Sequence, residues 1–303
     1  MSKRKNEQEF FVGYSRMPSK LSSFYKKLMV VLILLAVAVA TWLGVGQRDV
    51  GSATWDAFNK VTLTGYLSVD PYPVLQIPGD KPESVLLVRL GKLSAEDISR
   101  TFQNQPVSVS GFPIQRGGWR MLEIETEDDF KALDPNTHPA SAAAADATTT
   151  PFRAKGEIVD SKCFLGVMKP GAGKVHRACA QLCLKGGIPP IFVVKNSDGE
   201  AFGYLLTRAD GTSASTLLAP FAAVPVEISG NLQRRGDLVY LRMDDNPPRQ
   251  LSGHERADYG ESLAMASIEE HNICHLKAWG ACLATREGRS GLDNAPGIPF
   301  LGL

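Results

Sequence analysis

The residues of this sequence that are best suited to chemistry lie in one stretch between positions 160 and 190. That stretch contains one histidine and three cysteines: Cys163, His176, Cys179 and Cys183. One imidazole and three thiolates form a complete tetrahedral ligand set for Zn²⁺. They are also a soft set for Cu(I), to which the thioether of Met168 could contribute. The residue types therefore make this stretch a candidate zinc or copper site.

The local sequence indicates how these four residues come together. Pro170, Gly171 and Gly173 mark a turn, and a short helix is expected over 175–184, ending at the glycine pair 186–187. On such a helix the histidine and the two following cysteines have the spacing i, i+3 and i+7. This spacing places them within about 60° of one another on one stripe. Cys163 is expected to approach the stripe across the turn.

The same cysteines allow two other interpretations, and the first of them, a structural disulfide, is favoured over the metal site. Cysteines outside the cytoplasm tend to oxidise. A disulfide from Cys163 to Cys179 or Cys183 would close a loop of about 15–20 residues and contribute roughly 3 kcal/mol in the chain-entropy model. A reactive thiol is the third interpretation. It is the least favoured, because redox enzymes usually carry C-x-x-C at a helix N-terminus and this chain has no such pair.

A second group of the same residue types lies near the C-terminus: His271, Cys274, His275 and Cys282. Apolar spacings of three and four predict a helix over 255–287, on which the two histidines, at i and i+4, could share a metal ion. In a continuous helix the two cysteines would be about 12 Å apart along the axis, too far for a disulfide. A break at Gly280 would permit the bond. All five cysteines cannot pair within one chain.

Two parts of the chain resemble each other and predict a duplicated fold. Residues 106–111, PVSVSG, recur as residues 225–230, PVEISG, and Arg-Gly follows at the same distance in both copies. In each copy an alternating segment then completes the pattern of strand, glycine turn and strand, which is typical of a hairpin. Upstream, Gly65 and Gly156 each interrupt a strand-like segment, as a glycine does at the corner of a small barrel.

About five short strands in each copy resemble the OB-fold, a small closed or partly closed β-barrel. A small β-sandwich is the alternative. Matching residues 85–88 with 191–194 gives the second copy 15 extra residues before that strand and 13 after it. The first insertion carries the three cysteines, and the second, 196–220, is expected to pack beside them. The first copy contains neither Cys nor His and is expected to be a structural or docking module.

Residues 28–46 form the one long uncharged run, which as a helix would be about 28 Å long, roughly the hydrocarbon thickness of a bilayer. Lys26, Lys27 and further basic residues precede it. By the positive-inside rule the N-terminus stays in the cytoplasm and the chain from about residue 48 is exported. This predicts a single-pass protein of the bacterial inner membrane with periplasmic domains. A signal peptide cleaved after the A-x-A pattern at 38–40 is the alternative.

The expected fold class is mainly β, with one N-terminal transmembrane helix, two small OB-like barrels and a C-terminal helical segment. The predicted segments are a cytoplasmic tail (1–27), the anchor (28–46), a first barrel (52–130), an Ala/Thr/Pro-rich linker (131–152), a second barrel (153–250), and a C-terminal helix with an extended tail (251–303).

Charge and missing motifs exclude several function classes. The chain carries 33 basic and 32 acidic residues, and the basic excess is confined to residues 1–27, so no nucleic-acid partner is expected. No phosphate-binding, dinucleotide-binding or hydrolase motif is present. The sequence therefore favours a non-enzymatic, membrane-anchored accessory module. It would support a redox or metalloprotein system, and dock a protein partner of the envelope, through its Cys/His loop. A disulfide-stapled scaffolding protein is the alternative, and a thiol redox enzyme is the third.

Overall fold

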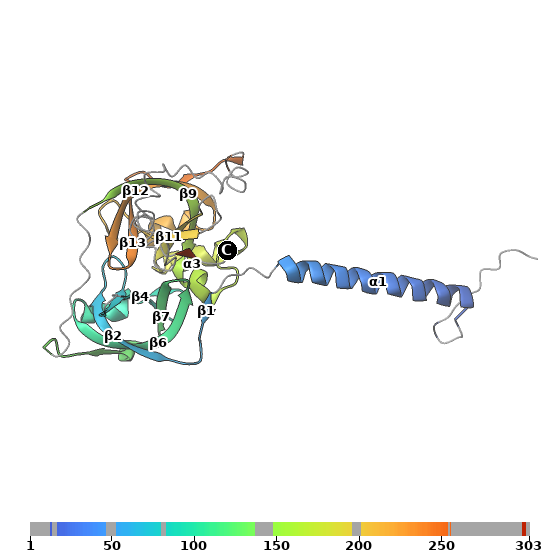
Figure 1. Ribbon diagram of the computed structural model, residues 1–303, viewed down its shortest axis with the longest axis horizontal. Helices are drawn as coiled ribbons and strands as arrows, with labels where there is room; N and C mark the ends of the chain where they lie inside the picture. The colour runs from blue at the N-terminus through green and yellow to red at the C-terminus, as the bar shows by residue number, and fades with distance from the viewer. Residues whose placement is uncertain are drawn as a thin grey trace, which may run out of the picture. The chain divides into compact units, whose positions relative to one another are not determined.

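The computed structural model describes residue 13 and residues 17–46, 53–79, 83–136, 148–195, 201–253, 255 and 299–300. The chain divides into two compact units, residues 1–49 and 50–303. The described part of the first unit is a helix, and the second unit is mainly β and contains two barrels (Figure 1).

The helix of the first unit, α1, spans Ser19–Gly46. Within its stretch from Ser19 to Gly44, an 18-residue window has a mean hydropathy of 2.3, and none of that window is buried within the protein. By length and composition α1 is able to cross a membrane, although signal sequences near an N-terminus share these properties. The helix begins nine residues before the predicted apolar run, because the preceding Lys and Tyr residues continue the helical backbone.

The first barrel is a closed sheet of five strands. In chain order these are β2 (Val61–Ser68), β3 (Val74–Ile77), β4 (Glu83–Arg89), β6 (Pro106–Arg116) and β7 (Trp119–Ile124). Around the barrel the order is β2, β3, β4, β7, β6 and back to β2. The β4–β7 pair is parallel and the other pairs are antiparallel. Three short strands extend this sheet at its edges: β1 (Thr54–Trp55), β5 (Leu93–Ser94) and β8 (Phe130–Ala132).

The second barrel repeats this order. Its strands are β9 (Thr150–Asp160), β10 (Pro190–Lys195), β11 (Ala201–Thr207), β12 (Pro225–Arg235) and β13 (Leu238–Met243). The order around it is β9, β10, β11, β13, β12 and back to β9, and again only the third and fifth strands run parallel. The edge strands are β14 (Arg249–Gln250) and β15 (Pro299–Phe300).

Strand register shows that the two barrels are copies of one pattern. Gly65 lies opposite Val107 in the first barrel, and Gly156 lies opposite Val226 in the second. A methyl group on either glycine would collide with a backbone carbonyl of the second strand of its barrel. Glycine is required at both positions because the second strand crosses so closely there.

The predicted match between residues 85–88 and 191–194 is wrong, because the former lie in β4, a third strand, and the latter in β10, a second strand. Leu67 pairs with Leu75, and Ile158 pairs with Phe192. Leu67 and Ile158, in the first strands, are 91 positions apart, whereas Leu75 and Phe192, in the second strands, are 117 positions apart. The loop between the first two strands is therefore 26 residues longer in the second copy. Fully apolar buried strands look alike in sequence, which explains the error.

No insertion follows the third strand. The helices between the third and fourth strands are α2 (Glu96–Ser99) with η1 (Arg100–Phe102), and α4 (Ser215–Leu218) with η5 (Ala219–Phe221). Corresponding residues are 119 positions apart, the same separation as between Gly111 and Gly230. The segment 196–220 is therefore the counterpart of a first-barrel segment, although its helices do pack on the helix that carries two of the cysteines.

The two barrels share a buried core. Tyr72 and Trp119 of the first barrel belong to the same cluster as Phe164 and Leu205 of the second. The Tyr72 hydroxyl donates a hydrogen bond to the carbonyl oxygen of Leu206 (2.5 Å) and accepts one from the amide of Ala214 (3.0 Å). Burial raises the pKa of this hydroxyl to about 12. The barrels are thus packed as one body rather than joined only by a chain segment.

Two predicted segments fall largely outside the described residues. Within the predicted linker, residues 137–147 are not described, and β8 and β9 occupy its two ends. The predicted C-terminal helix, with His271, Cys274, His275 and Cys282, also lies outside the described part of the chain.

Candidate metal centre at the barrel interface

The long loop between β9 and β10 carries the candidate site. After β9 ends at Asp160, the chain forms the short helical turn η3 (Cys163–Val167), the turn η4 (Lys174–His176) and the helix α3 (Arg177–Lys185). The predicted helix over 175–184 is therefore present, and it ends at Gly186 as its sequence indicates.

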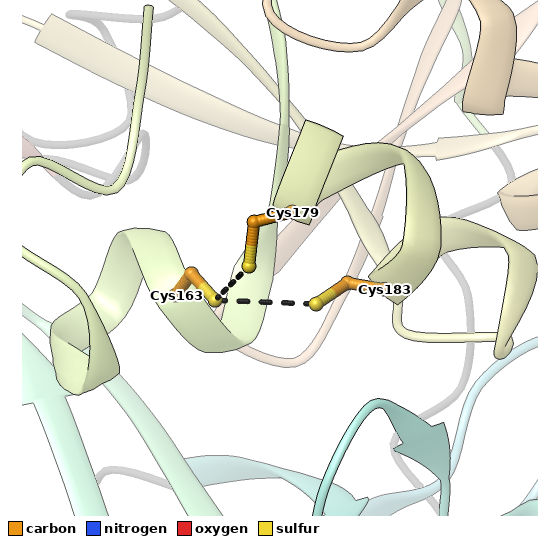
Figure 2. Close-up of side chains that lie close together, drawn as sticks. All are labelled: Cys163, Cys179 and Cys183. Atoms are coloured by element: carbon orange, nitrogen blue, oxygen red, sulfur yellow. Dashed lines mark hydrogen bonds between the residues drawn. The ribbon is translucent and has the colours of Figure 1, made fainter. Parts of the chain in front are cut away.

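The three cysteines of this loop converge. The Sγ atom of Cys163 lies 3.9 Å from the Sγ atoms of both Cys179 and Cys183 (Figure 2). All three sulfur atoms lie within 4.8 Å of one another. Each cysteine is a free thiol. The expected disulfide from Cys163 to Cys179 or Cys183 is therefore absent, because the 3.9 Å separations are far longer than the roughly 2.05 Å of an S–S bond. Cys163 and Cys183 are buried, and Cys179 is partly exposed.

His176 does not complete a set of four with the thiols. Its Nε2 atom lies 2.9 Å from Oδ2 of Asp160, and both side chains are buried. Oδ1 of Asp160 accepts a hydrogen bond from the amide of Cys163 (2.9 Å). Asp160, Cys163 and His176 therefore form a second potential ligand group that shares only Cys163 with the first. The helical stripe is present, but His176 lies in the turn before α3, from which it reaches Asp160 at the end of β9.

Met168, which was predicted as an additional soft ligand, has 45% of its surface exposed.

The first barrel contributes a charged group to the thiols. Nζ of Lys92 lies 2.7 Å from Sγ of Cys179 and 3.7 Å from Sγ of Cys183. The hydrogen bond to Cys179 raises the pKa of Lys92 above its ordinary value. The ammonium group therefore remains charged beside the sulfur atoms, where it favours thiolate over thiol.

The two buried thiols differ in acidity. Hydrogen bonding with Cys183, burial and nearby negative charges raise the pKa of the Cys163 thiol. The pKa of the Cys183 thiol is lowered, chiefly because Cys163 donates a hydrogen bond to its sulfur, and the charge of Lys92 contributes. Cys183 therefore ionises before Cys163.

A buried ion pair holds the turn that carries Lys92. Nζ of Lys162 lies 2.5 Å from Oε1 of Glu123, and both side chains are almost completely buried. The same ammonium donates to the carbonyl oxygens of Arg89 (2.9 Å) and Gly91 (2.7 Å). Since Lys162 directly precedes Cys163, one residue connects the turn at 89–92 to the thiol loop.

Gly186 also helps to hold the turn that carries Lys92. The carbonyl oxygen of Gly186 accepts a hydrogen bond from the amide of Ser94 (2.8 Å). A methyl group at position 186 would collide with the carbonyl oxygen of Lys92. The glycine that ends α3 therefore also permits the close approach of the first barrel.

Sequence analysis did not identify Lys92, Asp160 or Lys162 as parts of the site. No motif marks Lys92, because the barrel that carries it contains neither Cys nor His. Asp160 and Lys162 flank the first cysteine, and their proximity to Cys163 in the sequence was the available signal.

Three sulfur atoms in this arrangement can surround a single metal ion. Thiolates bound at about 2.3 Å are separated by roughly 3.8 Å in a tetrahedral complex and by about 4.0 Å in a planar three-coordinate one. The separations from Cys163 to Cys179 and Cys183, 3.9 Å each, lie within this range. Comparison of the chain with protein-family models, curated proteins and solved structures gave no match.

Proposed function

We propose that this protein is a membrane-anchored accessory module that binds a thiophilic metal ion, copper or zinc, through Cys163, Cys179 and Cys183. The observation that carries the proposal is the convergence of three sulfur atoms within 4.8 Å. Thiolates are the ligands that select copper(I), zinc and iron–sulfur clusters in proteins.

The charge of Lys92 supports a metal site over a structural disulfide. The ammonium group of Lys92 lies 3.7 Å from Sγ of Cys183, and its charge helps to lower the pKa of that thiol. The thiolate is the form that binds metals, whereas the sulfur atoms of a disulfide carry no charge for Lys92 to neutralise. A disulfide between any two members of the cluster would also leave the third thiol without a role.

The barrel topology supports a binding module. A closed barrel ordered 1-2-3-5-4, with strands 3 and 5 parallel, is the arrangement expected of an OB-fold, and we assign both barrels to it. OB-folds use the loop between their first two strands to bind ligands. In the second barrel this loop carries the 26 extra residues and the three cysteines. A fold by itself does not identify a function, so the proposal rests on the three thiols.

Metal content tests the proposal directly. The full chain is purified in mild detergent under anaerobic conditions, and bound copper and zinc are measured after exposure to each metal. A variant with Cys163, Cys179 and Cys183 changed to Ser is compared with one in which Cys274 and Cys282 are changed to Ser. We expect one equivalent of metal in the second variant and none in the first. Equal metal content in both variants contradicts the proposal. A Cys163 disulfide in a metal-free wild-type chain would instead favour the scaffolding alternative.

The anchor is proposed to hold the barrels outside the cytoplasm, because basic residues precede α1. A reporter that is active only after export should work when fused after residue 60 and fail when fused after residue 18. The opposite pattern would reverse the topology, and a mature chain beginning near residue 41 would show that α1 is a cleaved signal sequence.

A further inference from the structure

We infer that the cluster is built for three-coordinate copper(I), and that Lys92 of the first barrel determines this specificity. The inference rests on the proposed function, since it names the ion that the same three thiols select. Three observations support it. Three sulfur atoms converge, the positive charge of Lys92 lies beside them, and nearby carboxylates are bound to other groups.

The number of ligands favours copper(I). Among the described His, Cys, Asp and Glu residues, Cys163, Cys179 and Cys183 form the one ligand group in which all three atoms are sulfur. His176 lies against Asp160, and it shares a ligand group with Cys163 alone. Structural zinc sites require four protein ligands, whereas soft thiolate ligands suit copper(I). A set of three thiolates therefore fits copper(I) without a further protein ligand.

Lys92 lies against Cys179, the one member of the cluster that is partly exposed. Cys163 and Cys183 are buried, Cys179 is partly exposed, and Lys92 is exposed. A protonated lysine is not a metal ligand, and its position 2.7 Å from Sγ of Cys179 obstructs the approach of one.

The charge of Lys92 discriminates between the two ions. Three thiolates with Cu⁺ carry a net charge of about −2, and with Zn²⁺ about −1. A fixed positive charge within a few ångströms stabilises the more negative complex more strongly. Lys92 therefore favours copper(I) over zinc. A neutral side chain in its place would not discriminate between the two ions in this way.

The described acids near the cluster are engaged elsewhere. Asp160 is held by His176 and by the amide of Cys163, and Glu123 is paired with Lys162. Carboxylate oxygens suit harder ions and zinc better than copper(I). Because Asp160 and Oε1 of Glu123 already have partners, the sulfur atoms and the ammonium group of Lys92 define the chemistry of the cluster.

The experiment measures copper(I) and zinc affinities of the full chain in detergent. Every variant carries Cys274→Ser and Cys282→Ser, so that only the cluster supplies thiols. Copper(I) affinity is measured by anaerobic competition with bicinchoninate, and zinc affinity with a fluorescent zinc chelator. X-ray absorption then counts the atoms bound to copper. We expect three sulfur neighbours at about 2.2–2.3 Å, no nitrogen or oxygen neighbour, and a preference for copper(I) over zinc.

Lys92→Met should lower the copper(I) affinity by about tenfold or more relative to the zinc affinity, because it removes the charge and keeps the length of the side chain. Lys92→Arg keeps the positive charge and should therefore retain the preference for copper(I) over zinc. Lys174→Met, an exposed lysine of the same loop, is the matched control and should leave both affinities unchanged. The melting temperature of each metal-free variant reports whether the fold is intact.

Different results overturn the inference and the proposed function. A fourth nitrogen or oxygen neighbour on copper, a preference for zinc, or equal loss of both affinities in Lys92→Met overturns the inference. If zinc binds stoichiometrically through the three cysteines and copper(I) binds no more tightly, the proposed metal-binding function stands and the copper(I) specificity falls. If neither ion binds, both fall.

Discussion

The ammonium group of Lys92 in the first barrel lies 2.7 Å from Sγ of Cys179 in the second barrel. Two residues 87 positions apart in the chain thus meet at one site. The contact exists because the two barrels share a core and because Lys162 and Gly186 fix the turn that presents Lys92. The thiol cluster is therefore a property of the docked pair of barrels.

Metal binding should stabilise the whole two-barrel unit. An ion that binds only the folded state adds about 2.7 kcal/mol to the free energy of unfolding at 100 times its Kd, which corresponds to a rise of roughly 5–10 °C in Tm. Differential scanning fluorimetry of the full chain with added copper(I) should show this shift, and a chelator should reverse it. The variant with Cys163, Cys179 and Cys183 changed to Ser is the control and should show no shift.

Lys162→Met should destabilise the fold strongly. The change leaves the carboxylate of Glu123 buried without its ion-pair partner, at an expected cost of about 3–5 kcal/mol in the free energy of unfolding. Urea unfolding followed by tryptophan fluorescence measures the loss. The double variant Lys162→Met/Glu123→Leu should recover much of it, because no unpaired charge then remains. A double variant as unstable as Lys162→Met would contradict this account.

Gly186→Ala should displace the turn at 91–94 from α3. The added methyl group would overlap the carbonyl oxygen of Lys92, and overpacking of this kind costs typically 1–3 kcal/mol. The expected results are a lower free energy of unfolding and a weaker copper(I) affinity. Gly253→Ala is the control, since no atom lies within 4 Å of the added carbon there. Unchanged stability in Gly186→Ala would show that the turn moves without cost.

The carboxyl group of Glu157 should make the free energy of unfolding fall as pH rises. Burial raises the pKa of its carboxyl above 4.5, although the hydrogen bond from the amide of Gly173 opposes the shift. The folded protein therefore binds this proton more tightly than the unfolded chain does. The free energy of unfolding decreases as pH rises from about 4.5 through the folded pKa, and the full loss is reached above it.

Glu157→Gln should remove this decrease and stabilise the protein at neutral pH, as measured by urea unfolding at several pH values. Glu227→Gln is a control of opposite sign. The hydrogen bond from Arg153, with help from Arg249, lowers the pKa of Glu227, so its stabilisation is present at neutral pH and lost as pH falls. Equal pH profiles for the two variants would contradict both assignments.

The sequence by itself determined the features that depend on local periodicity. The repeated strand, turn and strand at 106–125 and 225–244, the helix that ends at Gly186, and the apolar helix α1 are each visible in short windows. The shared stripe of Cys179 and Cys183 follows from helical geometry alone. The sequence also pointed to Gly65 and Gly156, which were expected at a bend of the barrel, whereas the close approach of the second strand at both glycines is seen only in the structure.

Only the tertiary structure decided which partners meet across the barrels. The correct match of β10 with β3 required strand register, because apolar strands are interchangeable in sequence. His176 binds Asp160 rather than joining the three thiols, since its place in a turn before α3 changes its direction. Lys92 reaches Cys179 because apolar faces of two barrels pack together. The burial of those faces is non-directional, so no sequence pattern specifies which polar residues it brings side by side.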